Sequence, residues 1–170
     1  YSKAHEKYHP EIRKYLQSFS YYDIFIIDVK TGNIIYSVYK ELDFATSLLN
    51  GPYKNSGLAL VFNEVRNTND PDKISFSDFK QYTPSYEDPA AFIASPILNN
   101  DGETIAVLAF QLPIDKINNV LTMNKEWKKK GMGESGETYI VDEHYKAQSL
   151  SRHLIETPDK FLSRLKDNGV

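Results

Sequence analysis

A histidine pattern near the start of the chain is the first group of side chains that could do chemistry. His5, Glu6 and His9 fit H-E-x-x-H, the pattern of zinc metalloproteases, in which both histidines lie on one helical face and the glutamate polarises a zinc-bound water. Pro10 follows at once, and proline disfavours helical geometry at the residue before it, so we expect a helix to begin at Pro10. The extended protease pattern also needs a third ligand, which the sequence lacks at the required position. We therefore interpret this stretch as solvent-exposed and predict no metal site.

Other groups for catalysis or cofactor binding are few. The chain has no cysteine, which excludes disulfides, thiolate nucleophiles and cysteine-based zinc sites. The stretch GMGESG loosely fits a dinucleotide-binding pattern, but it precedes an expected strand instead of joining a strand to a helix. His144 and His153 have no partners at ligand spacing, and residues 149–152 lack the flanking glycines of a nucleophile elbow. We therefore expect no enzyme and no cofactor.

Acidic, phenolic and aromatic side chains gather instead in the stretch FSDFKQYTPSYEDPAAFIASP. If residues 74–82 form one strand, its period of two places Phe76, Asp78 and Tyr82 on the same face. Asp78 and Tyr82 then offer a carboxylate and a phenol, which together suffice to orient a small polar ligand. The sequence therefore predicts one wall of a ligand pocket here.

Neighbouring segments add to this candidate pocket. Small residues on the adjoining strand leave space, Phe92 is a candidate floor, and Gln111 at the end of the last strand offers an amide. Tyr86, in a proline-bounded loop, is a candidate lid. Aromatic residues at alternate strand positions also occur as ordinary core or edge packing, and that alternative stays open. The candidate ligand-binding residues are Asp78, Tyr82, Phe92, Gln111, Phe76 and Tyr86.

The elements that must position these residues alternate between helical and strand patterns. Apolar residues at three- and four-residue spacing predict a helix over 10–19, and two β-branched runs over 24–27 and 34–38 predict a hairpin. Further along, the patterns predict a helix through 58–65 capped by Asn55 or Ser56, strands at 74–82, 90–98 and 104–112, a helix from Pro113, a strand at 137–141 and a helix at 158–165.

This order is typical of an α+β fold of PAS type. Five antiparallel strands form the sheet, and a helical crossover lies over one face. We expect the long N-terminal helix on the other face and a small cavity beneath the crossover.

Composition excludes several classes of function. Hydrophobic residues make up 41% of the chain and charged residues 25%, as in ordinary globular proteins. A formal net charge of -3 argues against a nucleic-acid surface, and the basic cluster at 125–130 is too short to reverse that. No apolar run reaches the length that spans a bilayer, and no signal peptide is visible. If the native protein is anchored in a membrane, we expect this chain to be a piece excised from it.

Four stretches together cover most of residues 21–143: YYDIFIIDVKTGNIIYSVYKELDFATSLLNGPYKNSGLA, FSDFKQYTPSYEDPAAFIASPI, GETIAVLAFQLPIDKINNVLT and GMGESGETYIVDE. In this order they resemble the extracytoplasmic Cache-type (PAS-like) sensor domains of bacterial methyl-accepting chemotaxis proteins and related membrane sensors. The resemblance implies a periplasmic module held between two transmembrane helices outside this chain, with a small-molecule pocket in its sheet. Histidine kinases and nucleotide cyclases carry similar sensors, so the output domain stays open.

The chain departs from the pattern that the resemblance implies for amino-acid receptors. Those receptors commonly place Arg, Trp and Tyr on the pocket strand and an Asp late in the sheet. Here the expected pocket strand has neither Arg nor Trp, and Gln111 stands near the place of the acidic residue. This departure speaks against an amino-acid ligand. A small organic acid, held by Lys80, backbone amides or hydroxyls, is one remaining candidate.

We expect three regions: an N-terminal helix at 1–20, a PAS/Cache-like sensor module at 21–123, and an extension at 124–170 that begins a second, membrane-proximal module. The favoured function is a periplasmic ligand-sensing domain of a transmembrane chemoreceptor, with no nucleic-acid partner. The alternative is a partner-binding module of a histidine kinase or nucleotide cyclase receptor that senses through a periplasmic protein. The N-terminal helix is also a candidate homodimer interface.

Overall fold

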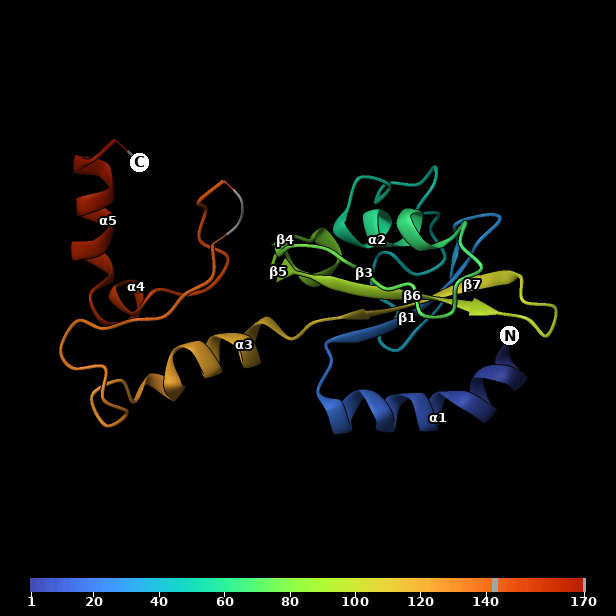
Figure 1. Cartoon of the computed structure of the whole chain (residues 1–170), viewed down its shortest axis with the longest axis horizontal. Coiled ribbons are helices and arrows are strands. Elements are labelled where there is room, and N and C mark those ends of the chain that lie inside the picture. The colour runs from blue at the N-terminus through green and yellow to red at the C-terminus, as the bar shows by residue number, and fades with distance from the viewer. Residues whose placement is uncertain (142–143, 170) are drawn as a thin grey trace. The chain divides into compact units, whose positions relative to one another are not determined.

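The computed structural model describes residues 1–141 and 144–169, so the end of the GMGESGETYIVDE stretch, at 142–143, lies outside the described residues. The chain divides into two compact units, Tyr1–Pro113 and Ile114–Val170. The first unit contains the whole sheet (Figure 1). The three regions expected from the sequence, at 1–20, 21–123 and 124–170, stay a prediction.

The first unit is built on a five-stranded antiparallel sheet with the strand order β2-β1-β7-β6-β3. The strands are β1 (Asp23–Asp28), β2 (Ile34–Ser37), β3 (Ser75–Phe76), β6 (Phe92–Leu98) and β7 (Thr104–Gln111). The two short strands β4 (Lys80–Gln81) and β5 (Pro89–Ala90) pair with each other in a separate sheet. The predicted α+β fold, its five-stranded sheet and its hairpin of β1 and β2 are confirmed.

Helix α1 (Ser2–Phe19) lies along one face of the sheet (Figure 1). Its buried residue Leu16 packs in a cluster with Ile24 and Tyr36. The prediction that this helix begins at Pro10 is wrong, because Pro10 lies inside a continuous helix. Tertiary contacts hold the turns before the proline: the His9 ring nitrogen Nδ1 lies 3.0 Å from the hydroxyl of Tyr36. Packing against a sheet thus overrides a local helix-breaking preference.

Helix α2 (Gly57–Val65) covers the opposite face of the sheet (Figure 1). As predicted, Ser56 caps it, and its side chain accepts a hydrogen bond from the Ala59 amide at 3.2 Å. The apolar side of the helix is fully buried in the main core, which also contains Phe25 from β1 and Phe92 from β6. The main core therefore lies on the α2 face, where the sequence predicted the cavity.

The predicted single strand at 74–82 is wrong in one respect, because it is broken in two. Strand β3 pairs with β6, whereas β4 pairs with β5. Between them, Ser77 exchanges hydrogen bonds with the backbone of Phe92, and its hydroxyl accepts from the Phe92 amide at 3.0 Å. The strict alternation of faces therefore stops before Tyr82. Phe76 and Asp78 are exposed to solvent while Tyr82 is buried, so the three do not share one face.

The C-terminal unit consists mainly of α3 (Ile114–Leu121), α4 (Arg152–Glu156) and α5 (Pro158–Asp167), with a short 3-10 turn, η2 (Met123–Lys125). The predicted helices from Pro113 and at 158–165 are confirmed. The predicted strand at 137–141 is wrong: among the described residues this segment makes only an isolated bridge between Val141 and Ala147. No strand pairs with it in the part of the chain that the structure describes, so the apolar run stays irregular.

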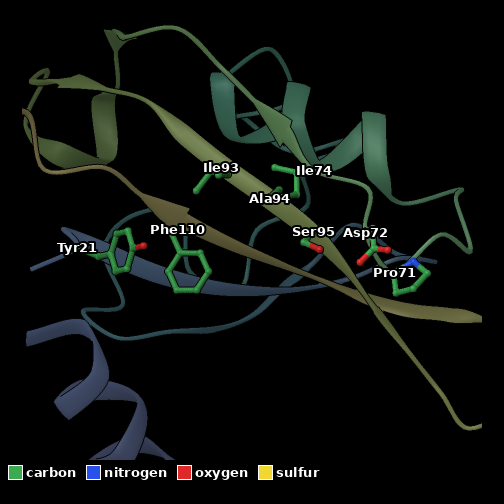
Figure 2. A pocket seen from close by; sticks show the side chains of 8 residues that line it. All are labelled: Tyr21, Pro71, Asp72, Ile74, Ile93, Ala94, Ser95 and Phe110. Atoms are coloured by element: carbon green, nitrogen blue, oxygen red, sulfur yellow. The ribbon is translucent and has the colours of Figure 1, made fainter. Parts of the chain in front are cut away.

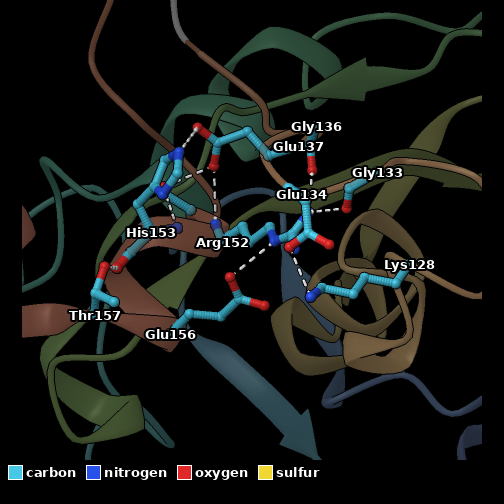
Figure 3. Close-up of polar contacts among 10 residues, drawn as sticks. Lys128, Gly133, Glu134, Gly136, Glu137, Arg152, His153, Glu156 and Thr157 are labelled. Carbon is cyan, nitrogen blue, oxygen red and sulfur yellow. Dashed lines mark hydrogen bonds and ion pairs between the residues drawn. The ribbon is translucent and has the colours of Figure 1, made fainter.

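A buried arginine organises this unit (Figure 3). Arg152 is 2% exposed, and its guanidinium donates to the carbonyl oxygens of Gly133 and Gly136 at 3.1 and 3.0 Å and to a Glu156 carboxylate oxygen at 2.9 Å. The guanidinium also lies over the ring of Trp127, 5.0 Å from its centre. The GMGESG stretch thus helps to enclose an arginine.

Within the described residues, no helix is long and apolar enough to cross a membrane.

Candidate functional site

A row of buried side chains crosses the sheet on the α2 face. Gln111 on β7 lies directly opposite Phe92 on β6 and directly opposite Asp23 on β1. Each of the three is at most 2% exposed. Residues directly opposite in antiparallel strands have Cβ atoms about 5 Å apart, so the amide of Gln111 and the carboxylate of Asp23 are neighbours.

The segment that follows β2 brings a second buried carboxylate to this row. Asp43 is fully buried, and one of its oxygens accepts a hydrogen bond from the Tyr82 hydroxyl at 2.6 Å. The Tyr82 ring packs edge-on against Phe92, with ring centres 5.0 Å apart, which places the phenol above the sheet. The other carboxylate oxygen of Asp43, Oδ1, has no hydrogen-bond donor among the described residues.

In Asp23, too, only one of the two carboxylate oxygens accepts hydrogen bonds. Its Oδ1 accepts from the backbone amides of Ile24 and Val38 at 2.7 and 2.8 Å, and Oδ2 has no donor within the described part of the chain. Burial raises the pKa of Asp23 to about 7, although the backbone amides lower it, and the nearby Asp43 raises it further. This carboxyl group therefore changes its charge near neutral pH.

A third carboxylate joins through Gln111. The Gln111 side chain donates to the Ser85 hydroxyl at 2.9 Å, and that hydroxyl lies 3.4 Å from an oxygen of Glu41. The other oxygen of Glu41 accepts from the Tyr22 hydroxyl at 3.0 Å. Burial raises the pKa of Glu41 above its usual range, and Asp43 adds to this. The amide oxygen of Gln111 has no donor among the described residues.

We call this group the acidic cluster and define it as Asp23, Glu41, Asp43, Tyr82, Ser85 and Gln111. It is rich in hydrogen-bond acceptors and poor in donors. In the described residues no lysine or arginine forms an ion pair with its carboxylates. Nor does any group of three or more His, Cys, Asp or Glu in that part of the chain have an arrangement that could hold a metal ion. Such a cluster suits a partner that brings hydrogen-bond donors.

The structure brings together half of the residues predicted from the sequence to bind ligand. Tyr82, Phe92 and Gln111 meet in or beside the acidic cluster. Phe76, Asp78 and Tyr86 lie outside it: Phe76 is 53% and Tyr86 86% exposed, and Asp78 is also exposed. Ligand contact by any of the six stays a prediction.

Sequence reasoning missed the carboxylates themselves. Asp23 stands directly before an apolar strand, and Asp43 lies in the stretch LDFAT between apolar residues. An acidic residue in an apolar surrounding is a usable signal, because carboxylates are rarely buried without a reason. Which carboxylates meet depends on strand pairing and on the path of the segment after β2, and neither follows from spacing along the chain.

The H-E-x-x-H residues have other partners. His5 and His9 stack with ring centres 4.3 Å apart, since they are one turn apart in α1. The Nε2 atom of His5 lies 2.8 Å from the Lys40 ammonium nitrogen. These contacts hold α1 to the segment after β2.

A separate hollow lies on the α1 face of the sheet (Figure 2). Its volume is about 270 Å³. Tyr21 and Phe110 form one side of it, and Ile93 and Ile74 come from the β6 and β3 side. Its lining is largely apolar and includes the charged side chain of Asp72. It shares none of the six predicted ligand-binding residues.

No protein-family model and no curated protein sequence matches the chain. Solved structures do match it. The ligand-binding domain of the Pseudomonas fluorescens chemoreceptor CtaA, solved in complex with L-serine, superimposes with a TM-score of 0.51 at 14% identity, over 85% of this chain and 51% of that one.

Two further sensor domains are similar. The Vibrio cholerae histidine kinase DctB sensor domain has a TM-score of 0.49 and 17% identity, over 69% of this chain and 41% of that one. The sensory domain of the Campylobacter jejuni chemoreceptor Tlp3 has a TM-score of 0.49 and 14% identity, over 86% of this chain and 52% of that one. This chain thus covers between 41% and 52% of each of these three sensor domains. Its fold is that of the Cache-type sensor domains that the sequence resembles, as the match to CtaA shows.

Proposed function

We propose that this chain is a non-catalytic, periplasmic ligand-sensing part of a transmembrane chemoreceptor. The observation that carries the proposal is the acidic cluster: Asp23, Asp43 and Gln111 each bury an acceptor oxygen without a donor in the described residues, on the face where a sensor of this fold would hold its ligand. Buried acceptors without donors are costly for a protein, so each calls for an explanation, and a bound ligand that supplies the donors is one.

Signalling follows from the position of Gln111. It is the last residue of β7, and only Leu112 and Pro113 separate it from α3. A ligand that binds Gln111 acts on the strand end from which α3 continues. It shifts the receptor between two states only by the difference between its affinities for them, so the cluster must differ in shape between those states.

Thermal melting of the chain against a panel of small organic acids, amino acids, amines and sugars tests direct sensing. A ligand that binds only the folded state raises its stability by about 2.7 kcal/mol at a hundredfold excess over Kd. We expect at least one class to raise the melting temperature, and we expect Tyr82→Phe to weaken the effect, because it removes the hydroxyl that orients Asp43. Tyr145→Phe, at a tyrosine that is 90% exposed and lies outside the cluster, serves as the matched tyrosine control.

A second candidate function is a module that senses through a periplasmic protein. The largely apolar hollow on the α1 face favours it, since such surfaces bind other proteins (Figure 2). A panel that leaves the melting temperature unchanged in every class would count against direct sensing and for this second function. We also propose that α1 forms a homodimer interface, because Tyr8, Tyr15 and Phe19 leave 46 to 60% of their surface exposed on it.

A further inference from the structure

The chemical class of the ligand follows from the acidic cluster, provided that this cluster is the ligand site proposed above. We infer that the acidic cluster binds the protonated amino group of a small organic amine. Within the described residues, three buried oxygens of the cluster have no donor, and no lysine or arginine forms an ion pair with its carboxylates.

The free acceptors match an ammonium group in number. An alkylammonium has three N–H donors and no acceptor. The cluster has three buried oxygens without a donor in the described residues: Oδ2 of Asp23, Oδ1 of Asp43 and Oε1 of Gln111. Asp23 and Gln111 are paired across β1 and β7, and Tyr82 holds Asp43 by its other oxygen. An ammonium group thus supplies both the donors and the charge that these oxygens lack.

Other ligand classes fit less well. An anion would meet the carboxylates of Asp23, Glu41 and Asp43 with no arginine among the cluster's described contacts, and Lys80 is exposed. A divalent metal needs several carboxylate or imidazole ligands around one point, and no described group has that arrangement. The structure therefore moves the expectation from an organic acid to an organic cation.

Aromatic rings beside the cluster suit the carbon part of such a ligand. The ring of Tyr82 lies near those of Phe92 and Tyr53, with centres 5.0 and 6.1 Å away. Faces of aromatic rings also attract cations. A short alkyl chain with a terminal ammonium matches this combination of acceptors and rings.

Protons compete with the amine for the same oxygens. Burial raises the pKa of Asp23 to about 7 and raises the pKa of Asp43 and Glu41 above their usual range. At low pH these groups are protonated and lose their charge, so the amine binds more tightly at pH 8 than at pH 5.5. The other titratable groups around these carboxylates are Tyr22, Tyr53, Tyr82 and Asp88.

Three probes of equal carbon length test the inference: 1,4-diaminobutane, succinate and 1,4-butanediol, added at constant ionic strength while thermal melting is followed at pH 8 and pH 5.5. We expect 1,4-diaminobutane alone to raise the melting temperature, and more strongly at pH 8. We expect Asp43→Asn and Asp23→Asn to weaken its affinity at least about tenfold. Asp101→Asn, in the exposed turn between β6 and β7, is the matched control and binds like the wild type.

The outcomes separate this inference from the proposed function. A shift with succinate or a sugar but not with the diamine would overturn the amine inference and leave direct sensing standing. A melting temperature unchanged by every member of the panel would overturn both. A diamine effect of equal size in wild type, Asp43→Asn and Asp23→Asn would place the amine outside the cluster and so refute the inference. If Asp43→Asn fails to fold, Asp23→Asn carries the comparison, because its side chain keeps the acceptor for Ile24 and Val38.

Discussion

Among the single residues, Asp23 shows how burial changes the pKa of a carboxyl group. Its pKa is raised from 3.8 to about 7, chiefly by burial. Backbone amides, those of Ile24 and Val38 above all, support its charged form but do not offset the loss of water. The folded protein therefore binds a proton there at pH values at which the unfolded chain has released it.

This difference predicts that the free energy of unfolding falls as pH rises. Between about pH 4 and pH 7 the folded state binds more protons than the unfolded state. The stabilising contribution of protonated Asp23 to the free energy of unfolding is therefore complete below pH 4 and lost above pH 7. The raised pKa corresponds to a contribution on the order of 4 kcal/mol. We expect Asp23→Asn to be more stable than wild type at pH 8, and to remove much of the pH dependence.

Urea unfolding at pH 5 and pH 8, followed by circular dichroism, measures this. Asp101→Asn removes an exposed carboxylate and should leave the difference between the two pH values as in wild type. Stability that rises from pH 5 to pH 8, or an unchanged difference in Asp23→Asn, would show that Asp23 is charged in the folded state throughout.

Among the secondary-structure elements, the short helix α4 depends on side chains more than on its own length. It has five residues, too few to be stable by backbone hydrogen bonds alone. Its N-cap is Ser151, whose side chain accepts from the His153 amide at 3.2 Å. Arg152 then ties the first turn to the glycine-rich segment before it.

We expect Arg152→Lys to loosen the C-terminal unit. Lysine keeps the charge, but its single ammonium cannot reproduce the guanidinium bonds to two carbonyl oxygens and to Glu156. The loss of buried, charge-assisted hydrogen bonds should cost about 2 kcal/mol or more. Hydrogen exchange should become faster at 133–137 and in α4 and stay as in wild type in β1 and β7.

Arg164→Lys is the matched control for this substitution, because Arg164 is exposed on α5. Exchange that speeds up equally in both variants would mean that the guanidinium of Arg152 does not hold the unit together. Exchange that also speeds up in β1 and β7 would mean that the two units unfold as one.

For the molecule as a whole, the proposed homodimer is tested by concentration. Helix α1 leaves the rings of Tyr8, Tyr15 and Phe19 partly exposed, and a second copy of the helix would cover them. We expect the average mass in sedimentation equilibrium to rise with protein concentration, and Tyr8→Glu to reduce that rise by placing a charge in the contact. Glu11→Gln, on the same helix, controls for a general change of surface charge. A constant monomer mass at millimolar concentration would refute the dimer.

Local patterns along the chain were enough to predict the order of elements and part of the candidate site. Spacing of apolar residues predicted the hairpin of β1 and β2, the capped helix α2 and the last strands, because local periodicity reflects which side of an element is buried. The sequence also pointed to Tyr82, Phe92 and Gln111, which the structure brings together. Local signals misjudged Pro10, since packing of α1 on the sheet outweighs the preference of one residue.

Which charges meet could be learned only from the folded chain. Asp23 and Gln111 are far apart in the sequence and become neighbours through the pairing of β1 with β7. Asp43 is bound by the hydroxyl of Tyr82, which follows β4. Tyr82 is buried there because the chain breaks between β3 and β4, and period-two reasoning does not foresee that break. Electrostatic character depends on distance and burial, and both are properties of the tertiary fold. For this reason the sequence suggested an acid as ligand, whereas the assembled carboxylates favour an amine.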